Sequence, residues 1–307
     1  MARNKEQGVA ETVSDGTRAI SKFRISDAVM MIIIALLSAT CVLPFWHVAV
    51  KSVSSNAAVA AKSVTLWPKG FTWEAYGSIF SDGSLTRAML YSVVITVVFT
   101  LFGMIVCTCA AYPLSKKRLK GGKVLTFLLM IPMYFSAGLL PTYLLYNDLN
   151  LLDSPWVLIW PLIYSPYNML IMKNFFISNI PDELEESAFL DGASNFQILG
   201  KIVMPLSKPI IATLSLFYAV GRWNSYSDNM YYIRTNSLKM AQYKLYEMIL
   251  NAQEAASTAL TEATNITSTP EVLQAASIMF VTLPIIVIYP FVQKYFVKGT
   301  MVGAVKG

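Results

Sequence analysis

Long apolar stretches alternate with shorter polar links along most of the chain. Six of them approach or exceed the length of about 20 residues that an α-helix needs to cross a bilayer. They run over residues 28–50, 87–113, 124–146, 156–177, 205–226 and 272–293. Because a lipid-exposed backbone must satisfy its own hydrogen bonds, such stretches form helices. The pattern predicts an all-α integral membrane protein with six spans.

Four prolines interrupt two of these stretches. Pro132 and Pro141 lie in the third, and Pro161 and Pro166 lie in the fourth. Proline removes a backbone donor, and membrane helices tolerate it where neighbouring helices or cavity water satisfy the freed carbonyls. We therefore expect both helices to be kinked and packed inside the bundle. The first stretch has no small-residue cleavage site behind it, so we interpret it as a retained span.

Composition supports the membrane assignment. The chain has 307 residues, of which 55% are hydrophobic and 14% are charged, whereas soluble domains carry roughly 25% charged residues. Its 24 Lys and Arg against 18 acids flank the apolar stretches, which favours a role in topology over nucleic-acid binding. Three cysteines inside apolar stretches and one histidine form no metal-ligand pattern, so no metal site is expected.

The distribution of Lys and Arg predicts the orientation of the spans. Sixteen of the 24 basic residues fall in the N-terminal tail, the second-to-third and fourth-to-fifth links, and the C-terminal tail. We therefore expect both termini in the cytoplasm. The predicted organisation is an N-terminal tail (1–27), a six-span domain (28–294) and a C-terminal tail (295–307). Outside lie two long links, 51–86 and 227–271; for the second, a short amphipathic helix and a mobile loop both fit.

The fourth-to-fifth link contains an acidic segment, 181–204, which is predicted to be two short helices joined by a bend. Pro181 suits a first helical position, and the acids that follow it favour a helix N-terminus. Gly192 permits a sharp bend. Beyond it, Phe196, Leu199, Ile202 and Val203 recur at helical spacing, and Pro205 suits the start of the fifth span. An ordinary interfacial linker and a docking element remain equal alternatives at this point.

The chain lacks a Gly-x-x-x-x-Gly-Lys-Ser/Thr phosphate loop, so we expect nucleotide to bind elsewhere. An ion-coupled secondary transporter is the rival class, and it would need ionisable groups within the membrane. No Asp or Glu lies inside the six predicted spans, and Asp228 stands at the border of the fifth. This pattern argues against ion coupling.

The acidic segment resembles the EAA loop of binding-protein-dependent ABC importer permeases, whose pattern is Glu-Ala-Ala, Asp-Gly-Ala and Ile-x-Leu-Pro. This chain has Glu186-Ser187-Ala188, Asp191-Gly192-Ala193 and Ile202-Val203-Met204-Pro205, so Ser187 and Met204 depart from the pattern. Segments such as 136–143, 217–225 and the Lys-Gly-containing C-terminus are similar to the carbohydrate subgroup. The likeness is greatest to the smaller permease of maltose-type systems, in the branch serving oligosaccharides and polysaccharide fragments such as alginate.

The resemblance implies a type I importer transmembrane domain in which this loop is a coupling helix seated in a cleft of an ATPase. The chain would then be no enzyme, and ATP and Mg would bind to the partner ATPase subunits. Expected partners are a second homologous permease, two ATPase copies, a lipid-anchored or periplasmic sugar-binding protein and membrane lipid, in a bacterial cell membrane. The implied coupling residues are Glu185, Glu186, Ser187, Ala188, Asp191, Gly192, Ala193 and Pro205. A non-sugar ABC permease stays open as an alternative.

Aromatic and amide side chains are candidates for a sugar path, because sugars bind aromatic faces surrounded by hydrogen-bonding groups. Asn224 beside Trp223, near the outer end of the fifth span, is the preferred pair. The same residue types also collect at membrane interfaces without contacting any ligand. The full candidate set is Tyr134, Tyr143, Tyr167, Asn168, Trp223 and Asn224.

Overall fold

The computed structural model describes the backbone of residues 25–262 and 270–304, and every regular element in those ranges is helical. The α-helices are α1 (Ile25–Ser52), α2 (Asn56–Ala60), α3 (Glu74–Asp82), α4 (Ser84–Leu114), α5 (Gly122–Tyr134), α6 (Leu139–Asp148), α7 (Pro166–Asn179), α8 (Asp182–Leu190), α9 (Asn195–Ile198), α10 (Met204–Leu206), α11 (Lys208–Asn224), α12 (Ser227–Tyr232), α13 (Ala241–Glu262) and α14 (Pro270–Ala304). Three short 3-10 turns, η1 (Pro155–Leu158), η2 (Trp160–Leu162) and η4 (Asn236–Leu238), and one π-helical turn, η3 (Leu199–Val203), complete the set.

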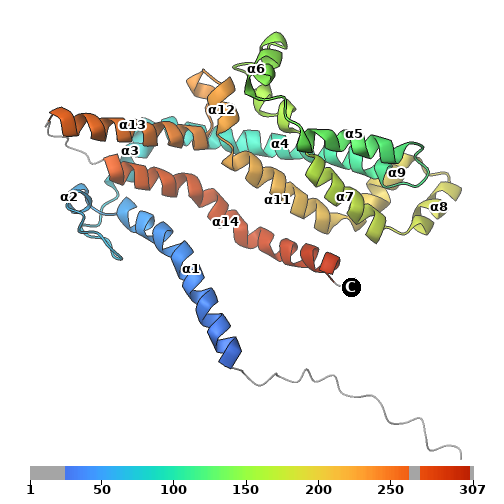
Figure 1. The fold of residues 1–307 in the computed structure, drawn as a ribbon, viewed down its shortest axis with the longest axis horizontal. Coiled ribbons are helices and arrows are strands. Elements are labelled where there is room, and N and C mark those ends of the chain that lie inside the picture. Colours follow the sequence, from blue (N-terminus) through green and yellow to red (C-terminus); the bar gives the residue numbers. More distant parts are fainter. Residues whose placement is uncertain (1–24, 263–269, 305–307) are drawn as a thin grey trace, which may run out of the picture. The chain divides into compact units, whose positions relative to one another are not determined.

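The chain divides into two compact units, Met1–His47 and Val48–Gly307. The described part of the first unit is most of α1, an apolar helix whose Val29 to Val42 side chains are largely exposed. The second unit holds all the other elements. Within it, α8 and α9 lie at the end where α4 finishes and α5 begins, and α2, α3 and α13 lie at the opposite end (Figure 1).

Within the part of the chain that the structure describes, three helices are individually long and apolar enough to cross a membrane. They correspond to Asp27–Ser52, Ser84–Leu114 and Glu271–Pro290, and they confirm the first, second and sixth predicted stretches as continuous helices. The helix α14 runs on to Ala304, so it passes through the boundary expected at residue 295. The final three residues lie outside the described part of the chain.

The third predicted span is broken, where a kinked helix was expected. Its halves, α5 and α6, meet at an angle of 111°. Phe135 is extended and Gly138 has a φ of 86°, so the backbone leaves the helix between them. A positive φ is freely available to glycine. The break therefore falls at residues 135–138, while Pro132 and Pro141 lie within the two half-helices.

The fourth predicted span is a helix only in its second half. Residues 155–162 form the turns η1 and η2, and α7 begins at Pro166, where the Ser165 hydroxyl accepts a hydrogen bond from the Asn168 backbone. Each of these three elements has a proline in its first turn, where the missing donor costs nothing. The prediction of one kinked helix over 156–177 was thus wrong in its first half, where Pro155, Pro161 and Pro166 each lie at the start of a new helical element.

The fifth predicted span begins later than expected. The helix α11 starts at Lys208 and is bent by 86° from the preceding segment Asn195–Leu206. Pro205 belongs to α10, before the bend, and Pro209 occupies the first turn of α11. The proline that suits a helix start is therefore Pro209, four residues beyond the one predicted.

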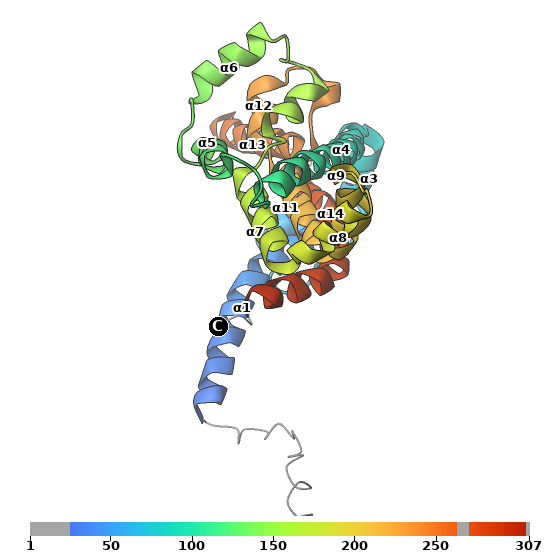
Figure 2. The ribbon, with the colours of Figure 1, turned by 90° about the vertical axis from the view of Figure 1, so that its right-hand side faces the viewer.

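A helical core joins segments far apart in sequence. The helices α4, α7 and α11 pack closely on one another, as do α11 and α14 (Figure 2). Their shared core includes Cys107, Met172, Phe176 and Leu214, all fully buried. Beyond this core, the link 227–271 contains α12, η4 and the long helix α13, so its helical alternative is confirmed up to residue 262.

Candidate coupling segment and substrate path

The first helix of the acidic segment is α8. Pro181 is its N-cap, with φ −60° and ψ 136°, so it precedes the first helical position expected from sequence. Asp182, Glu183 and Glu185 stand in the first turn, where the partial positive charge of the helix N-terminus stabilises carboxylates. The acidic side chains of this stretch therefore stabilise the start of the helix.

The bend after α8 is a Schellman motif centred on Gly192. The Ala193 amide donates to the Ala188 carbonyl at 2.9 Å, and the Gly192 amide donates to the Phe189 carbonyl at 3.0 Å. Gly192 has a φ of 79°, in the left-handed region where a side chain is disfavoured. The predicted helix–bend–helix is thus present, with glycine at the residue that turns it.

The second helix of the segment starts with a capping box that the sequence analysis missed. The Ser194 hydroxyl accepts from the Gln197 amide, and the Gln197 side chain accepts from the Ser194 amide at 2.8 Å. The signal was readable, because Ser-x-x-Gln is a recognised N-terminal pattern. It fixes the direction in which α9 leaves the bend.

The acidic segment 181–204, the candidate coupling segment, has an outward and an inward face. Leu190 is 90% exposed and Phe196 is 84% exposed, and both flank the bend. Glu186, Ser187, Asp191 and Gly192 are also exposed, while Ala188 and Ala193 are half-buried. The buried face of this part of the segment is formed by Ile198 and Val203, and Phe196 is not part of it. Leu190 was not among the predicted coupling residues.

Glu185 points inward, unlike its neighbour Glu186. Its side chain is only 6% exposed and forms an ion pair with Lys116, which follows α4. The Tyr112 hydroxyl, 3.5 Å away, donates to the same carboxylate. A buried carboxylate needs such a partner, because an unpaired buried charge is strongly destabilising. This geometry gives Glu185 a role inside the chain and leaves Glu186 on the surface.

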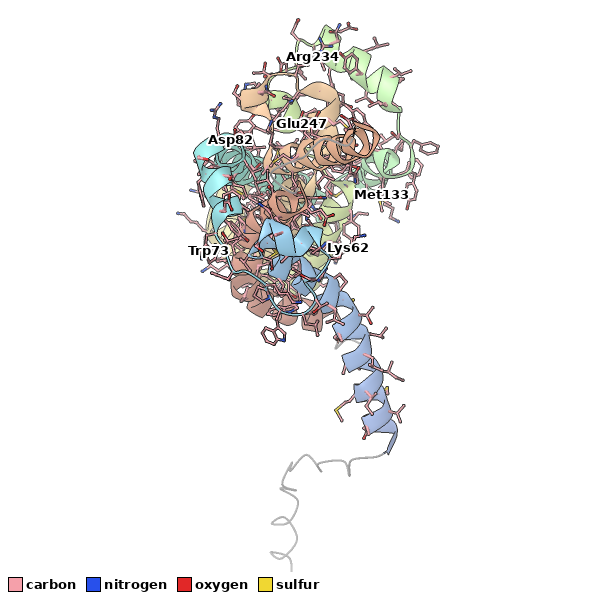
Figure 3. The ribbon with its side chains drawn as sticks, turned by 90° about the vertical axis from the view of Figure 1, so that its left-hand side faces the viewer. Lys62, Trp73, Asp82, Met133, Arg234 and Glu247 are labelled. Carbon is pink, nitrogen blue, oxygen red and sulfur yellow. The ribbon has the colours of Figure 1, made fainter. Side chains whose placement is uncertain are left out.

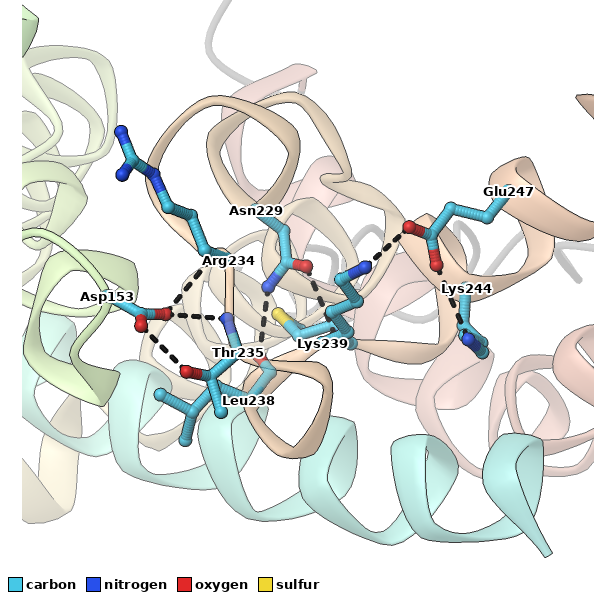
Figure 4. Close-up of polar contacts among 9 residues, drawn as sticks. Asp153, Asn229, Arg234, Thr235, Leu238, Lys239, Lys244 and Glu247 are labelled. Atoms are coloured by element: carbon cyan, nitrogen blue, oxygen red, sulfur yellow. Dashed lines mark hydrogen bonds and ion pairs between the residues drawn. The ribbon is translucent and has the colours of Figure 1, made fainter.

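Asp153 connects the link before η1 with the link between α12 and η4 (Figure 4). Its carboxylate accepts from the amides of Arg234 at 2.9 Å and Thr235 at 2.8 Å, and from the Thr235 hydroxyl at 2.7 Å. These hydrogen bonds hold the pKa of Asp153 below its usual range. Nearby, Asn229 is fully buried and donates to the Leu238 carbonyl at 3.2 Å.

An aromatic cluster lies beside this tie. The rings of Tyr143 and Tyr232 are stacked at 6.3 Å, and Tyr146 meets Tyr232 edge-on at 5.0 Å. The exposed guanidinium of Arg234 donates to the Tyr143 hydroxyl at 3.1 Å. Figure 3 labels Arg234 and Glu247 in the region of α12 and α13. It also labels Trp73, which precedes α3, and Asp82, which ends that helix.

The candidate sugar-path residues differ in how far their side chains are exposed. Tyr134 and Tyr167 are exposed, and Asn224 is exposed at the end of α11. Asn168 and Trp223 are buried, and Trp223 packs with Leu85, Leu245 and other core side chains. Tyr143 is half-buried on α6. The preferred pair Trp223–Asn224 thus has one member committed to the protein core.

Comparison with known proteins bears on this architecture. Residues 109–302 match the model of the family described as "Binding-protein-dependent transport system inner membrane component". The chain belongs to this family. The matched range includes the coupling segment and the helices that surround it. It is therefore the permease subunit of an ABC importer, and its family is one of transport subunits rather than enzymes.

Individual relatives of this permease cover nearly all of its length. It is 39% identical to Protein LplC of Bacillus subtilis (strain 168), over 92% of this chain and 96% of that protein. It is also 39% identical to the polygalacturonan/rhamnogalacturonan transport system permease protein YtcP of the same strain, over 93% and 100%. Among solved structures, a bacterial ABC transporter involved in the import of the acidic polysaccharide alginate has a chain that is 32% identical, with a TM-score of 0.80, over 89% of this chain and 99% of that one.

Proposed function

We propose that this permease imports an oligosaccharide through the bacterial cell membrane, and that partner ATPase subunits drive it by docking on the coupling segment. One observation carries the docking proposal. Leu190 and Phe196 place two large apolar side chains almost fully in the open on either side of the Gly192 bend. Exposed apolar anchors beside charged groups are typical of protein-binding surfaces.

The docking face combines those anchors with charge. Glu186 and Asp191 are exposed on the same short segment. Apolar side chains inserted into a cleft would supply affinity, and the carboxylates would set orientation. ATP and Mg bind to the partner in this proposal. The remaining assembly consists of a second permease of the same fold, a second ATPase copy and an extracellular sugar-binding protein.

The proposed substrate class follows from the relatives. One is described by transport of polygalacturonan and rhamnogalacturonan, and another by import of the acidic polysaccharide alginate. An oligosaccharide, with uronate-containing fragments as the first class to test, is the cargo most consistent with them. Of the candidate path residues, Tyr134, Tyr167 and Asn224 have side chains available to a ligand.

The orientation in the proposal places α8 and α9 in the cytoplasm with both termini. It is supported by the basic residues that surround these helices, since Lys and Arg favour the cytoplasmic side. The end with α2, α3 and α13 would then face the binding protein. In this proposal the binding protein releases sugar at that end, and the ATPase acts at α8. Transport therefore requires that the two ends are coupled through the helices between them.

The docking proposal is tested by co-purification and uptake. Phe196→Ala and Leu190→Ala remove the anchors, and we expect the ATPase to separate from the membrane complex. Glu186→Lys and Gly192→Pro should have the same effect, the second because proline cannot adopt a φ of 79°. Phe71→Ala is the matched control, because Phe71 is 61% exposed and lies in the predicted outer link. Normal ATPase association in all four variants would exclude the docking site.

The substrate proposal needs a separate measurement. Vesicles containing the assembled complex and its binding protein should hydrolyse ATP faster when an oligosaccharide substrate is added. Alginate and galacturonan fragments are the first probes, and neutral galacto-oligosaccharides are the comparison. Stimulation by neutral fragments alone would move the substrate to another sugar class, and stimulation by none of them would favour a non-sugar importer.

A further inference from the structure

Three consecutive basic residues after α4 contact three points of the coupling segment. Lys116 pairs with Glu185, Lys117 lies 3.2 Å from Asp182, and Arg118 donates to the Asn195 side chain at 2.6 Å. The Arg118 guanidinium also lies 4.4 Å from the centre of the Phe189 ring. The run that sequence analysis attributed to membrane topology is therefore also engaged with α8 and α9.

Of these three contacts, only the pair Lys116–Glu185 is a buried ion pair. The side chains of Lys116 and Glu185 are 8% and 6% exposed, whereas those of Lys117 and Asp182 are 91% and 57% exposed. Tyr112 completes it, because its hydroxyl donates to Glu185 and its ring lies 5.1 Å from the Lys116 ammonium. An exposed pair contributes little, but a buried pair specifies one geometry, since either partner alone is costly.

The backbone of α8 offers no comparable attachment. The closely packed helix pairs include α4 with α11 and α4 with α7, and α8 is a member of none of them. Its contacts with the rest of the unit include the half-buried Ala188 and Phe189 and the side-chain contacts with residues 112–118. The helix that would receive the ATPase is thus linked by side chains to the helix at the centre of the bundle.

We infer that Lys116 and Glu185, with Tyr112, form a clasp that makes the coupling segment and the cytoplasmic end of α4 move together. Lys116 and Glu185 are then positioning residues for transport, acting between the docking face and the spans. The inference rests on the proposed docking of an ATPase at α8. A displacement of α8 would reach α4 directly, and from there α7 and α11, because packed helices transmit shifts as rigid elements.

Lys120 provides the comparison for a purely topological role. It lies in the same link, is exposed, and makes no ion pair or hydrogen bond among the described residues. Neutralising Lys120 and neutralising Lys116 each remove one positive charge from the same link. A difference between the two variants therefore reports the clasp and not the membrane orientation.

The test uses the complete transporter in vesicles, with its ATPase and binding protein, and measures sugar taken up per ATP hydrolysed. For Glu185→Gln and Lys116→Met we expect this ratio to fall about tenfold, while the ATPase still co-purifies because the outward face is unchanged. Lys120→Ala should match the wild type. Lys116→Arg should keep the ratio, because it preserves the charge, and exchange of the partners (Lys116→Glu with Glu185→Lys) should recover most of the loss.

A variant without buried charge keeps the inference testable if single changes do not fold. Lys116→Met combined with Glu185→Gln leaves neither partner ionised, and we expect normal insertion with the same low ratio. A wild-type ratio in this variant, or loss of the ATPase from it, would overturn the clasp. Failure of the docking proposal would be a separate result. The ATPase would then still co-purify with the Phe196→Ala variant, independently of the transport ratios of the Lys116 and Glu185 variants.

Discussion

The guanidinium of Arg222 lies 2.5 Å from the carboxylate of Asp228, and their side chains are 0% and 9% exposed. Arg222 also donates to the Leu158 carbonyl at 2.9 Å and lies 5.6 Å from the centre of the Phe99 ring. One buried ion pair thus connects the end of α11 with α12, η1 and α4. Asp228, the acid nearest to the spans in the sequence analysis, is engaged in this pair and is not a free relay group.

Loss of the Asp228 carboxylate should destabilise the permease strongly. Asp228→Ala leaves the Arg222 charge buried without its partner, which typically costs about 3–5 kcal/mol. We expect a large fall in the thermal midpoint of the detergent-solubilised protein. Asp148→Ala, at an exposed acid that ends α6, is the control. The double variant Arg222→Met with Asp228→Leu should recover much of the lost stability. Equal thermal midpoints for Asp228→Ala and Asp148→Ala would contradict the argument.

The tie made by Asp153 should depend on pH. The pKa of its carboxyl is lowered in the folded protein from an ordinary value of 3.8. Its stabilisation is therefore fully present above that value and is lost as the pH falls through the lower, folded-state pKa. At pH 7, Asp153→Ala should cost about 0.5–1.5 kcal/mol, because three donors lose a charged acceptor at a site open to water.

Thermal midpoints of wild type and Asp153→Ala, compared from neutral pH downwards, check this expectation. The difference should stay constant to about pH 4 and shrink below it. Exchange of the Thr235 amide hydrogen should be faster in the variant at neutral pH, since that amide donates to Asp153. A midpoint difference that persists unchanged in strong acid would show that the carboxylate charge is not involved.

Gly103 permits the close approach of α4 and α11. A Cβ atom there would lie 2.7 Å from Cε1 of Tyr218, a ring that is almost fully buried. Gly103→Ala should therefore destabilise by about 1–3 kcal/mol through overpacking. Gly221→Ala on α11 meets nothing within 4 Å, so it should be neutral or stabilising by about 0.5–1 kcal/mol. Thermal midpoints of Gly103→Ala and Gly221→Ala, measured in detergent, test this expectation. Similar midpoints would contradict a close contact between Gly103 and Tyr218.

The proposed orientation can be measured with single cysteines. After replacement of Cys41, Cys107 and Cys109, Lys69→Cys should react with a membrane-impermeant maleimide on cells whose outer surface is accessible. Lys120→Cys should react only after the membrane is opened, because its link is expected in the cytoplasm. Both positions are exposed in the structure. Labelling of residue 120 before residue 69 would reverse the orientation.

Features that depend on neighbours along the chain were predictable from sequence. Apolar length identified the three continuous spans, and acids followed by Gly192 identified the helix–bend–helix, because both effects act within a few residues. Proline was a weaker guide. It indicated interruptions in the third and fourth spans, but the angle of 111° between α5 and α6 arises at residues 135–138, where no proline lies.

Only the tertiary structure decided which side of each helix is buried against the protein and which side is exposed. In a membrane protein an apolar residue is equally suited to lipid and to protein, so hydrophobicity does not distinguish them. Helical spacing likewise did not reveal that the Phe196 side chain is 84% exposed. Glu185 and Glu186 are chemically equal in sequence, yet only Glu185 meets Lys116, which lies 69 positions earlier in the chain. Composition and local pattern identified a membrane protein with an acidic helix–bend–helix at residues 181–204, whereas long-range packing selected the residues that hold that segment in place.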